Sequence, residues 1–265
     1  MNRHKILYYS DSSTDDFAGT NIRTNHIGED FCYIHHSFFW KALSALLYYC
    51  VALPLVWIAA KVYLGIKIEN KDVLRSLRHT GYYLYGNHTR VLDAYVPPLV
   101  SFPKRSYFIA GPDVVSIPGI RNLVMLLGAL PIPTEFHALN HFIQAVSYRV
   151  NEKHCIAVYP EAHVWPFYTG IRPFAATSFY YPVKDNVPAV AMVTTYRKRS
   201  GLFFWVKKPG MTITLSSPMY PDLSLPRRKA QEELRDKVFL FMKETSEGRQ
   251  QPEYIQYIYR PKEKM

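Results

Sequence analysis

The longest uncharged run of the chain constrains its fold most. Nineteen consecutive residues, Ala42 to Ala60, carry no charge, and about 20 apolar residues are needed to cross the hydrocarbon core of a bilayer. Aromatic side chains mark both ends of this run, as they do at membrane interfaces: Phe38, Phe39, Trp40, Trp57 and Tyr63. We therefore predict a membrane-associated helical segment over residues 36–70. Pro54 interrupts the pattern because proline removes a helical hydrogen bond, so a full span and a hairpin dipping into one leaflet both remain open.

Positive charge follows the apolar run and dominates the whole chain, whose formal net charge is +11. By the positive-inside tendency, cations directly after the run place the domain that follows on the cytoplasmic side: Lys61, Lys67, Lys71, Arg75 and Arg78. Two further basic clusters, residues 197–199 and 207–208, come without a nucleic-acid-binding motif. We therefore expect anionic membrane lipids, and no nucleic acid, as partners.

The remaining sequence predicts a single α/β domain. Apolar, β-rich runs alternate with helical patterns between residues 81 and 216, and the last three runs have no helix between them, which indicates a mixed sheet flanked by helices. Strands are predicted at 82–85, 106–110, 129–132, 156–159, 189–194, 202–206 and 211–215, and helices at about 93–101, 118–127, 135–152, 174–182 and 226–247. The predicted organisation is a polar N-terminal segment (1–35), the membrane-associated segment (36–70), a catalytic domain (71–250) and a basic tail (251–265).

The cysteines and the polarity of the first 30 residues indicate the cellular compartment of the protein. The three cysteines, Cys32, Cys50 and Cys155, are odd in number and far apart, so neither a disulfide framework nor a zinc site is expected, and a reducing cytoplasm is compatible. The first 30 residues are polar, so we expect no signal peptide at the start.

A histidine and a carboxylate stand five residues apart directly after a predicted strand, at His88 and Asp93. Five residues apart in a continuous helix point in different directions. If His88 instead lies on the turn that leaves the strand and Asp93 in the first turn of the next helix, the carboxylate can reach the imidazole. It would then fix the ring tautomer and leave the other nitrogen free as a base. With no Ser or Cys nearby as nucleophile, the pair predicts direct deprotonation of a substrate hydroxyl.

Three more motifs follow in order, and the set of four resembles the glycerolipid acyltransferases, whose best-known members are the lysophosphatidic acid acyltransferases. The matching residues are Asn87-His88-x4-Asp93, Gly128 to Ile132, Tyr159-Pro160-Glu161-Ala162-His163-Val164 with Pro173-Phe174, and Val187 to Ala191. The resemblance covers residues 80–195. It implies an acyltransferase with His88 and Asp93 as the catalytic pair, and a substrate-binding group of Pro160, Glu161, His163 and Arg172.

The chain departs from the family pattern at its phosphate-binding positions. Thr134 stands where the second motif normally ends in Arg, Ala162-His163-Val164 replaces Gly-Thr-Arg, and a common Lys is absent near Gly111. Arg and Lys bind phosphates by bidentate or point-charge pairing. Arg121, Arg172 or His163 are candidates to substitute for them.

The resemblance implies a membrane-bound O-acyltransferase that moves an acyl chain from acyl-CoA or acyl-ACP, as co-substrate, to a lysophospholipid hydroxyl, foremost that of 1-acylglycerol-3-phosphate. No metal and no cofactor are expected. The acyl chain is expected against the apolar N-terminal segment or along Leu123–Leu127. Two alternatives remain open at this point: acylation of another hydroxylated lipid that lacks the usual phosphate contacts, and a non-catalytic lipid-binding relative.

Overall fold

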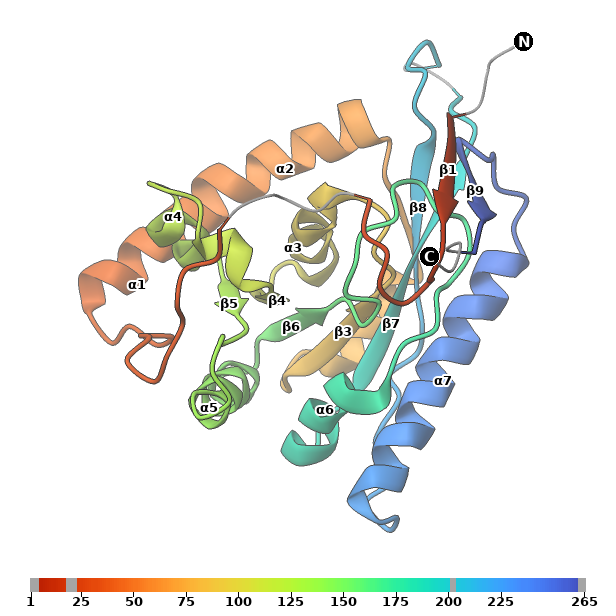
Figure 1. Ribbon diagram of the computed structural model, residues 1–265. Helices are drawn as coiled ribbons and strands as arrows, with labels where there is room; N and C mark the ends of the chain where they lie inside the picture. The colour runs from red at the N-terminus through yellow and green to blue at the C-terminus, as the bar shows by residue number, and fades with distance from the viewer. Residues whose placement is uncertain (1–4, 18–22, 201–203, 262–265) are drawn as a thin grey trace.

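The fold is built on a seven-stranded mixed sheet, seen in a computed structural model that describes residues 5–17, 23–200 and 204–261 (Figure 1). Its strand order is β2-β8-β7-β3-β6-β4-β5, with β7 and β8 antiparallel and the neighbours β3, β4, β5, β6 and β7 parallel. The predicted α/β class with a mixed sheet is confirmed. The strands are β2 (Lys67–Glu69), β3 (Tyr82–Gly86), β4 (Ser106–Ala110), β5 (Ala129–Pro131), β6 (Cys155–Val158), β7 (Ala189–Arg197) and β8 (Gly210–Leu215).

Both faces of the sheet are covered, as parallel strands require. In the central strand β3, Tyr83 and Tyr85 point into one core and Tyr82 and Leu84 into the other, because successive side chains of a strand alternate between faces. The first face carries α5 (Leu139–Asn151), η6 (Ala176–Phe179), α6 (Tyr180–Asp185) and α7 (Arg227–Glu247), and the second carries η3 (Lys71–Leu77) and α3 (Val96–Ser101), which η4 (Val91–Tyr95) directly precedes in the chain.

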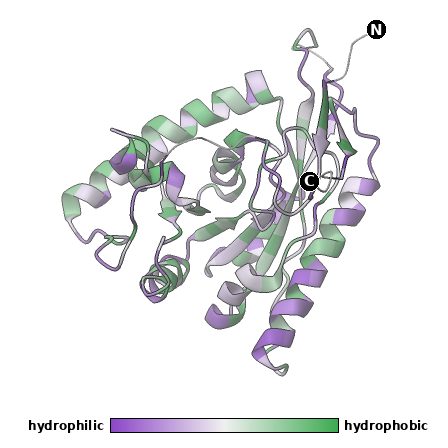
Figure 2. Ribbon diagram, in the orientation of Figure 1, coloured by the Kyte–Doolittle hydropathy of each residue, from purple (hydrophilic) through white to green (hydrophobic). Residues whose placement is uncertain are grey.

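The apolar segment is one continuous helix from Phe38 to Leu64, long and apolar enough to cross a membrane by length and composition. It comprises α1 (Phe38–Ala45), η1 (Leu46–Ala52), α2 (Leu53–Ala59) and η2 (Ala60–Leu64). The π-helical stretch η1 ends at Ala52, two residues before Pro54, and wider turns of this kind accommodate proline without ending the helix. Residues 38–64 therefore do not fold back as a hairpin at Pro54. Figure 2 shows the apolar character along this helix.

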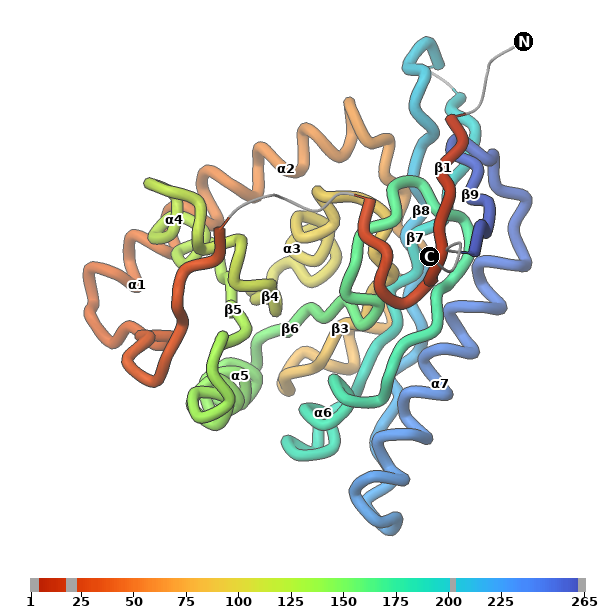
Figure 3. Tube along the Cα trace, in the orientation of Figure 1, coloured from red at the N-terminus to blue at the C-terminus, as the bar shows by residue number. Residues whose placement is uncertain are grey.

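Two terminal strands escaped prediction. Strand β1 (Lys5–Tyr9) pairs in parallel with β9 (Ile255–Tyr259), so the two ends of the described chain lie side by side in a separate two-stranded sheet (Figure 3). The strand predicted at 202–206 is not found: residues 202 and 203 lie outside the described residues, and Phe204 and Trp205 form a turn. Both edges of that turn are rich in lysine and arginine, whose repulsion disfavours extending the ladder between β7 and β8.

Shorter elements differ from the predictions mainly at their ends. The helix predicted at 118–127 is α4 (Arg121–Leu126), and a short η5 (Pro112–Val115) precedes it. The helix predicted at 135–152 starts at Leu139, because residues 132–138 lead out of β5 as a loop that pairs with the N-terminal segment.

Candidate active site

The candidate site lies where the parallel strands end, at the carboxyl end of β3. Asn87, the first residue after β3, locks this edge to the neighbouring strand: its Nδ2 donates to the Thr194 carbonyl (3.0 Å), and the Thr194 N–H donates to its Oδ1 (2.7 Å). A buried amide that satisfies both of its polar ends fixes the backbone. The next residue, His88, therefore leaves the sheet in a defined direction.

His88 and Asp93 meet in the geometry that the sequence predicted. Nδ1 of His88 lies 3.2 Å from Oδ2 of Asp93, and the Asp93 side chain is 2% exposed against 16% for His88. The same carboxylate oxygen accepts the backbone N–H groups of Thr89 (2.7 Å) and Arg90 (2.8 Å). Asp93 is the third residue of η4 and reaches back to its N-cap, an arrangement that starts a helix and holds the carboxylate at once.

Tyr159 is a member of the site that sequence reasoning missed. Its ring stacks on His88, with centroids 4.6 Å apart, and its hydroxyl donates to the Asp93 carbonyl (2.6 Å). A Cβ on Gly86 would lie 2.7 Å from the Tyr159 ring, so the glycine before the motif makes room for this contact. The sequence signal was an aromatic residue between a strand and Pro160-Glu161.

Glu161 and Arg172 lie together beneath the site, each with a side chain 1% exposed. Glu161 Oε2 accepts the His88 N–H (3.1 Å) and Arg172 Nη2 (3.1 Å), while Oε1 accepts the Arg172 N–H (3.0 Å). Burial raises the pKa of the Glu161 carboxyl, and the Arg172 charge and the N–H donors oppose that rise. The pair joins the third-motif loop to the backbone of His88.

His163 and Pro160 occupy more open positions of the same loop. The His163 side chain is 37% exposed and lies 3.8 Å from Asp16, and its carbonyl accepts a hydrogen bond from Arg172. Pro160 is half-buried at the end of β6. Between them Ala162 has φ +63°, the left-handed region that favours glycine, and the motif that this loop resembles has Gly at that position.

The N-terminal segment contacts both loops at which the chain departs from the resembled motifs. At the third motif, Asp16 accepts the Val164 N–H (3.3 Å) and the Trp165 indole N–H donates to the Asp15 carbonyl (2.7 Å). At the second, the Thr134 N–H donates to the Ile27 carbonyl (3.1 Å), and the Thr134 hydroxyl accepts the Ile27 N–H (2.9 Å). The residues predicted to be a separate polar segment thus pack onto the domain.

A narrow apolar crevice opens beside Asp93, between the N-terminal helix, α3 and α4. Its open volume is about 40 Å³, and it is lined by Tyr48, Ala52, Leu53, Val56, Ala94, Tyr95, Pro98, Phe108, Val124 and Leu127. Tyr48 holds one side, accepting the Ser106 N–H with its hydroxyl (3.0 Å). The crevice brings together the apolar helix and the stretch around Leu123–Leu127, the two surfaces expected to hold an acyl chain.

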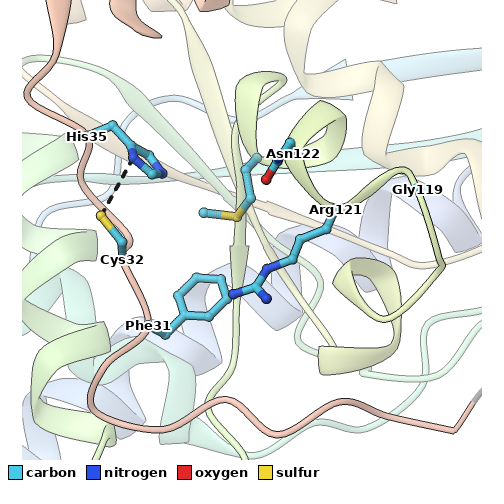
Figure 4. Close-up of a pocket in the computed structure, with 7 residues that line it drawn as sticks. Phe31, Cys32, His35, Gly119, Arg121 and Asn122 are labelled. Carbon is cyan, nitrogen blue, oxygen red and sulfur yellow. Dashed lines mark hydrogen bonds between the residues drawn. The ribbon is translucent and has the colours of Figure 1, made fainter.

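A second, more polar cavity of about 420 Å³ separates the N-terminal segment from α4 (Figure 4). Phe31, Cys32 and His35 face Arg121 and Asn122 across it. The Arg121 guanidinium lies 4.9 Å from the centre of the Phe31 ring, and burial lowers the pKa of His35. Arg121, one of the candidate substitutes for the missing phosphate-binding residues, therefore lines this cavity and stacks on the N-terminal segment.

Comparison with known proteins decides the family. A family model described as Acyltransferase matches residues 65–213, more than half of the chain. The chain belongs to this family. It is an acyltransferase, and its predicted resemblance to the lysophosphatidic acid acyltransferases is confirmed. No curated protein matches the chain significantly.

A solved structure shares the family fold. The 1-acyl-sn-glycerophosphate (LPA) acyltransferase PlsC from Thermotoga maritima aligns with a TM-score of 0.56 and 19% identity, over 82% of this chain and 84% of that one. At this identity the likeness shows the fold alone. Each of the four motifs lies within the family match and adjoins or overlaps one strand of the sheet: β3, β5, β6 and β7, in chain order.

Proposed function

We propose that this acyltransferase moves an acyl chain from an acyl thioester to a lysophospholipid hydroxyl, with His88 as general base and Asp93 orienting it. The foremost acceptor is 1-acylglycerol-3-phosphate. The observation that carries the proposal is the 3.2 Å contact between His88 Nδ1 and the buried Asp93 carboxylate. That contact leaves Nε2 available for a proton, at the sheet edge where α/β folds place ligands.

The proposed reaction is one direct transfer. Nε2 of His88 takes the proton of the acceptor hydroxyl while the hydroxyl oxygen attacks the thioester carbonyl carbon. The tetrahedral intermediate then collapses, the C–S bond breaks, and the leaving thiolate takes the proton from His88. Asp93 stabilises the imidazolium between these steps. Tyr159, stacked on the ring, would limit its rotation.

The donor is acyl-CoA or acyl-ACP, and we assign its acyl chain to the crevice beside Asp93. The crevice is lined by Ala94 and Tyr95, the two residues that follow Asp93 in the chain, and by residues of the N-terminal helix and of the sheet. About 40 Å³ is little more than the volume of one water molecule. An acyl chain would therefore enter by parting the N-terminal helix from α3 and α4.

We place that helix in the plane of the membrane surface, with the catalytic domain on the cytoplasmic side. Ser44 donates to the Leu126 carbonyl (2.6 Å), and Gly65, just past the other end, accepts from Arg197 (2.9 Å). A helix fastened to the domain near both ends cannot cross a bilayer alone. Of the 18 most apolar consecutive residues of this helix, only 11% are buried against the domain. The helix therefore keeps an exposed apolar face that can contact an anionic lipid membrane.

A hydroxylated lipid without a terminal phosphate is a second acceptor class. It is favoured because the arginines nearest the motifs are already engaged in contacts within the protein. Arg172 is paired with Glu161, and Arg90 lies 4.8 Å from the Phe167 ring centre, donating to the sulfur of Met211. Both cations closest in sequence to the motifs are thus engaged inside the protein. A phosphomonoester would have to displace these contacts, whereas a hydroxylated lipid with a neutral headgroup would not.

The test is acyl transfer by the purified full-length protein in lipid nanodiscs. Labelled acyl-CoA and acyl-ACP would be offered with lysophosphatidate, lysophosphatidylcholine and a lyso-glycolipid, and products identified by mass spectrometry. We expect His88→Ala to lower kcat by at least about 10²-fold, and Asp93→Asn to lower it while the acceptor KM changes little. His79→Ala, at an exposed loop histidine, is the matched control. Undiminished transfer by His88→Ala would refute the proposed base.

A further inference from the structure

The turn between β7 and β8 lies at the same end of the strands as the motif that contains His88 and Asp93. Thr194 of β7 is bonded to Asn87, the residue before His88, and β7 continues to Arg197 before the chain turns. The turn therefore projects beyond the site, and in Figure 1 it rises at the top of the molecule, past the end of α2. We call its described residues, 198–200 and 204–208, the β7–β8 tip.

The tip combines exposed aromatic rings with cations. Phe204 is 71% and Trp205 60% exposed, and their rings meet edge to face with centroids 5.6 Å apart. Lys198 and Lys207 are exposed on either side of them. Tryptophan and phenylalanine favour the interfacial region of a bilayer, and lysines next to them are attracted to anionic headgroups.

Hydrogen bonds join the base of the tip to the end of the apolar helix. Arg199 donates to the carbonyls of Tyr63 and Val62, and Lys208 Nζ donates to the Tyr63 hydroxyl (2.7 Å). The Lys208 ammonium also lies 5.2 Å from the centre of the Tyr63 ring. Tip and helix end are therefore held as one unit, and a membrane that receives the apolar face of the helix also meets the tip.

Basic residues continue from the tip along the helix. A groove of about 1080 Å³ runs between the helix and the sheet edge, with an apolar lining that includes Leu53 and Trp57. Its cations are Lys61, Lys67, Lys71 and Arg197. An apolar floor with a cationic rim matches the amphipathic chemistry of an anionic lipid.

We propose that the β7–β8 tip is a second membrane contact, which inserts Phe204 and Trp205 at the level of anionic headgroups and sets the tilt of the catalytic edge over the bilayer. This inference rests on the proposed placement of the helix in the membrane surface, and it is independent of the chemistry of His88. A single helix leaves the domain free to rotate about the helix axis. A second contact to one side of that axis removes this freedom and turns the mouth of the site toward its lipid substrate.

The first experiment measures the depth of Trp205 with the full-length protein on vesicles of phosphatidylglycerol and phosphatidylcholine, with and without brominated acyl chains. Trp40→Phe and Trp57→Phe remove the helix tryptophans, and Trp165, 1% exposed in the core, stays as an internal reference. We expect bromine to quench the remaining emission, and the further change Trp205→Phe to abolish that quenching. Equal emission with and without bromine would overturn the proposal.

The second experiment measures lipid selectivity. Lys198→Gln with Lys207→Gln should reduce the preference for anionic over zwitterionic vesicles by about 30-fold, at about fivefold for each cation near the surface. The control pair Arg228→Gln with Lys229→Gln neutralises two exposed cations at the start of α7, which lies at the other end of the molecule from the tip (Figure 1), and should leave the preference unchanged. An equal loss in both pairs would refute the tip as a specific contact.

Two outcomes keep this inference distinct from the proposed function. Quenching of Trp205 together with absent acyl transfer to every acceptor would leave the tip standing and remove the function. If acyl carrier protein alone, without vesicles, shields Trp205 from a soluble quencher, the tip is a donor-docking surface and the membrane proposal fails.

Discussion

Replacing Glu161 by Gln separates two roles for the third motif. Glu161 accepts three hydrogen bonds, two from Arg172 and one from the His88 N–H, and both side chains of the ion pair are 1% exposed. A Gln amide can present only one oxygen, so its NH2 group must face a donor. The substitution also leaves the Arg172 guanidinium buried without its counter-charge.

The expected cost follows from this burial. Breaking a fully buried pair by removing one partner costs about 3–5 kcal/mol of unfolding free energy, which corresponds to a fall in Tm of roughly 6–20 °C for a domain of this size. Arg172→Met should cost a similar amount, and the double variant less than the sum of the two, because neither charge is then left alone. Glu232→Gln, which breaks the exposed pair with Arg228, should change stability by less than about 0.5 kcal/mol.

The assay pairs chemical unfolding in detergent micelles with steady-state acyl transfer below the Tm of each variant. If Glu161 holds the backbone of His88, Glu161→Gln lowers kcat and leaves the acceptor KM close to that of the wild type. An unchanged unfolding free energy with a raised acceptor KM would refute this reasoning, and would instead support Glu161 as a substrate-binding carboxylate.

Three further predictions concern the crevice, the loop and pH. Val56→Trp fills the crevice and should shift donor preference to shorter acyl chains, with each excluded methylene costing about 0.8 kcal/mol, roughly fourfold in kcat/KM. Ala162→Gly should raise the unfolding free energy by about 0.5 kcal/mol, since relief of a positive φ outweighs the entropy of a freer unfolded chain; a lower melting temperature would contradict it. Burial lowers the pKa of His154 to about 4, so the unfolded chain binds a proton between pH 6.5 and 4 that the folded protein does not. The full shift corresponds to about 3 kcal/mol, at about 1.4 kcal/mol for each pKa unit, and solvent screening of the partly exposed ring reduces it. Stability should therefore fall by about 1–2 kcal/mol as pH drops through this window, and His154→Gln should flatten the fall measured by urea titration.

The spacing of apolar residues along the chain was the basis of most of the fold prediction. The strands of the sheet centre are short and buried on both faces, so their apolar runs were visible, and Gly86, Gly128 and Asn186 mark their ends. The His88–Asp93 contact was predictable because His88 directly follows a strand and Asp93 lies in the first turn of the next helix. The two residues are only five positions apart, so the short backbone between them brings the two side chains together. Such local geometry depends on few distant contacts.

Elements that depend on distant partners were not predictable. Lys5–Tyr9 is a strand because Ile255–Tyr259 lies beside it, and no pattern within either segment reveals that pairing. Tyr159 likewise takes its place through contacts with the first motif, at His88 and Asp93. The turn at Phe204 and Trp205 has the composition of a strand, since exposed aromatic residues and core aromatic residues look alike in a sequence.

The pairing of β1 with β9 has a consequence for synthesis. Strand β9 leaves the ribosome roughly 12–50 s after β1, at about 5–20 residues per second, so β1 has no sheet partner while most of the chain is made. Only then does Tyr257 stack on Trp165 at 4.8 Å and donate to the Pro166 carbonyl (2.9 Å). We therefore expect the loop beside His88 to reach its final form only after β9 has been made, so that a chain interrupted between β1 and β9 would hold His88 and Asp93 beside an incompletely packed third-motif loop.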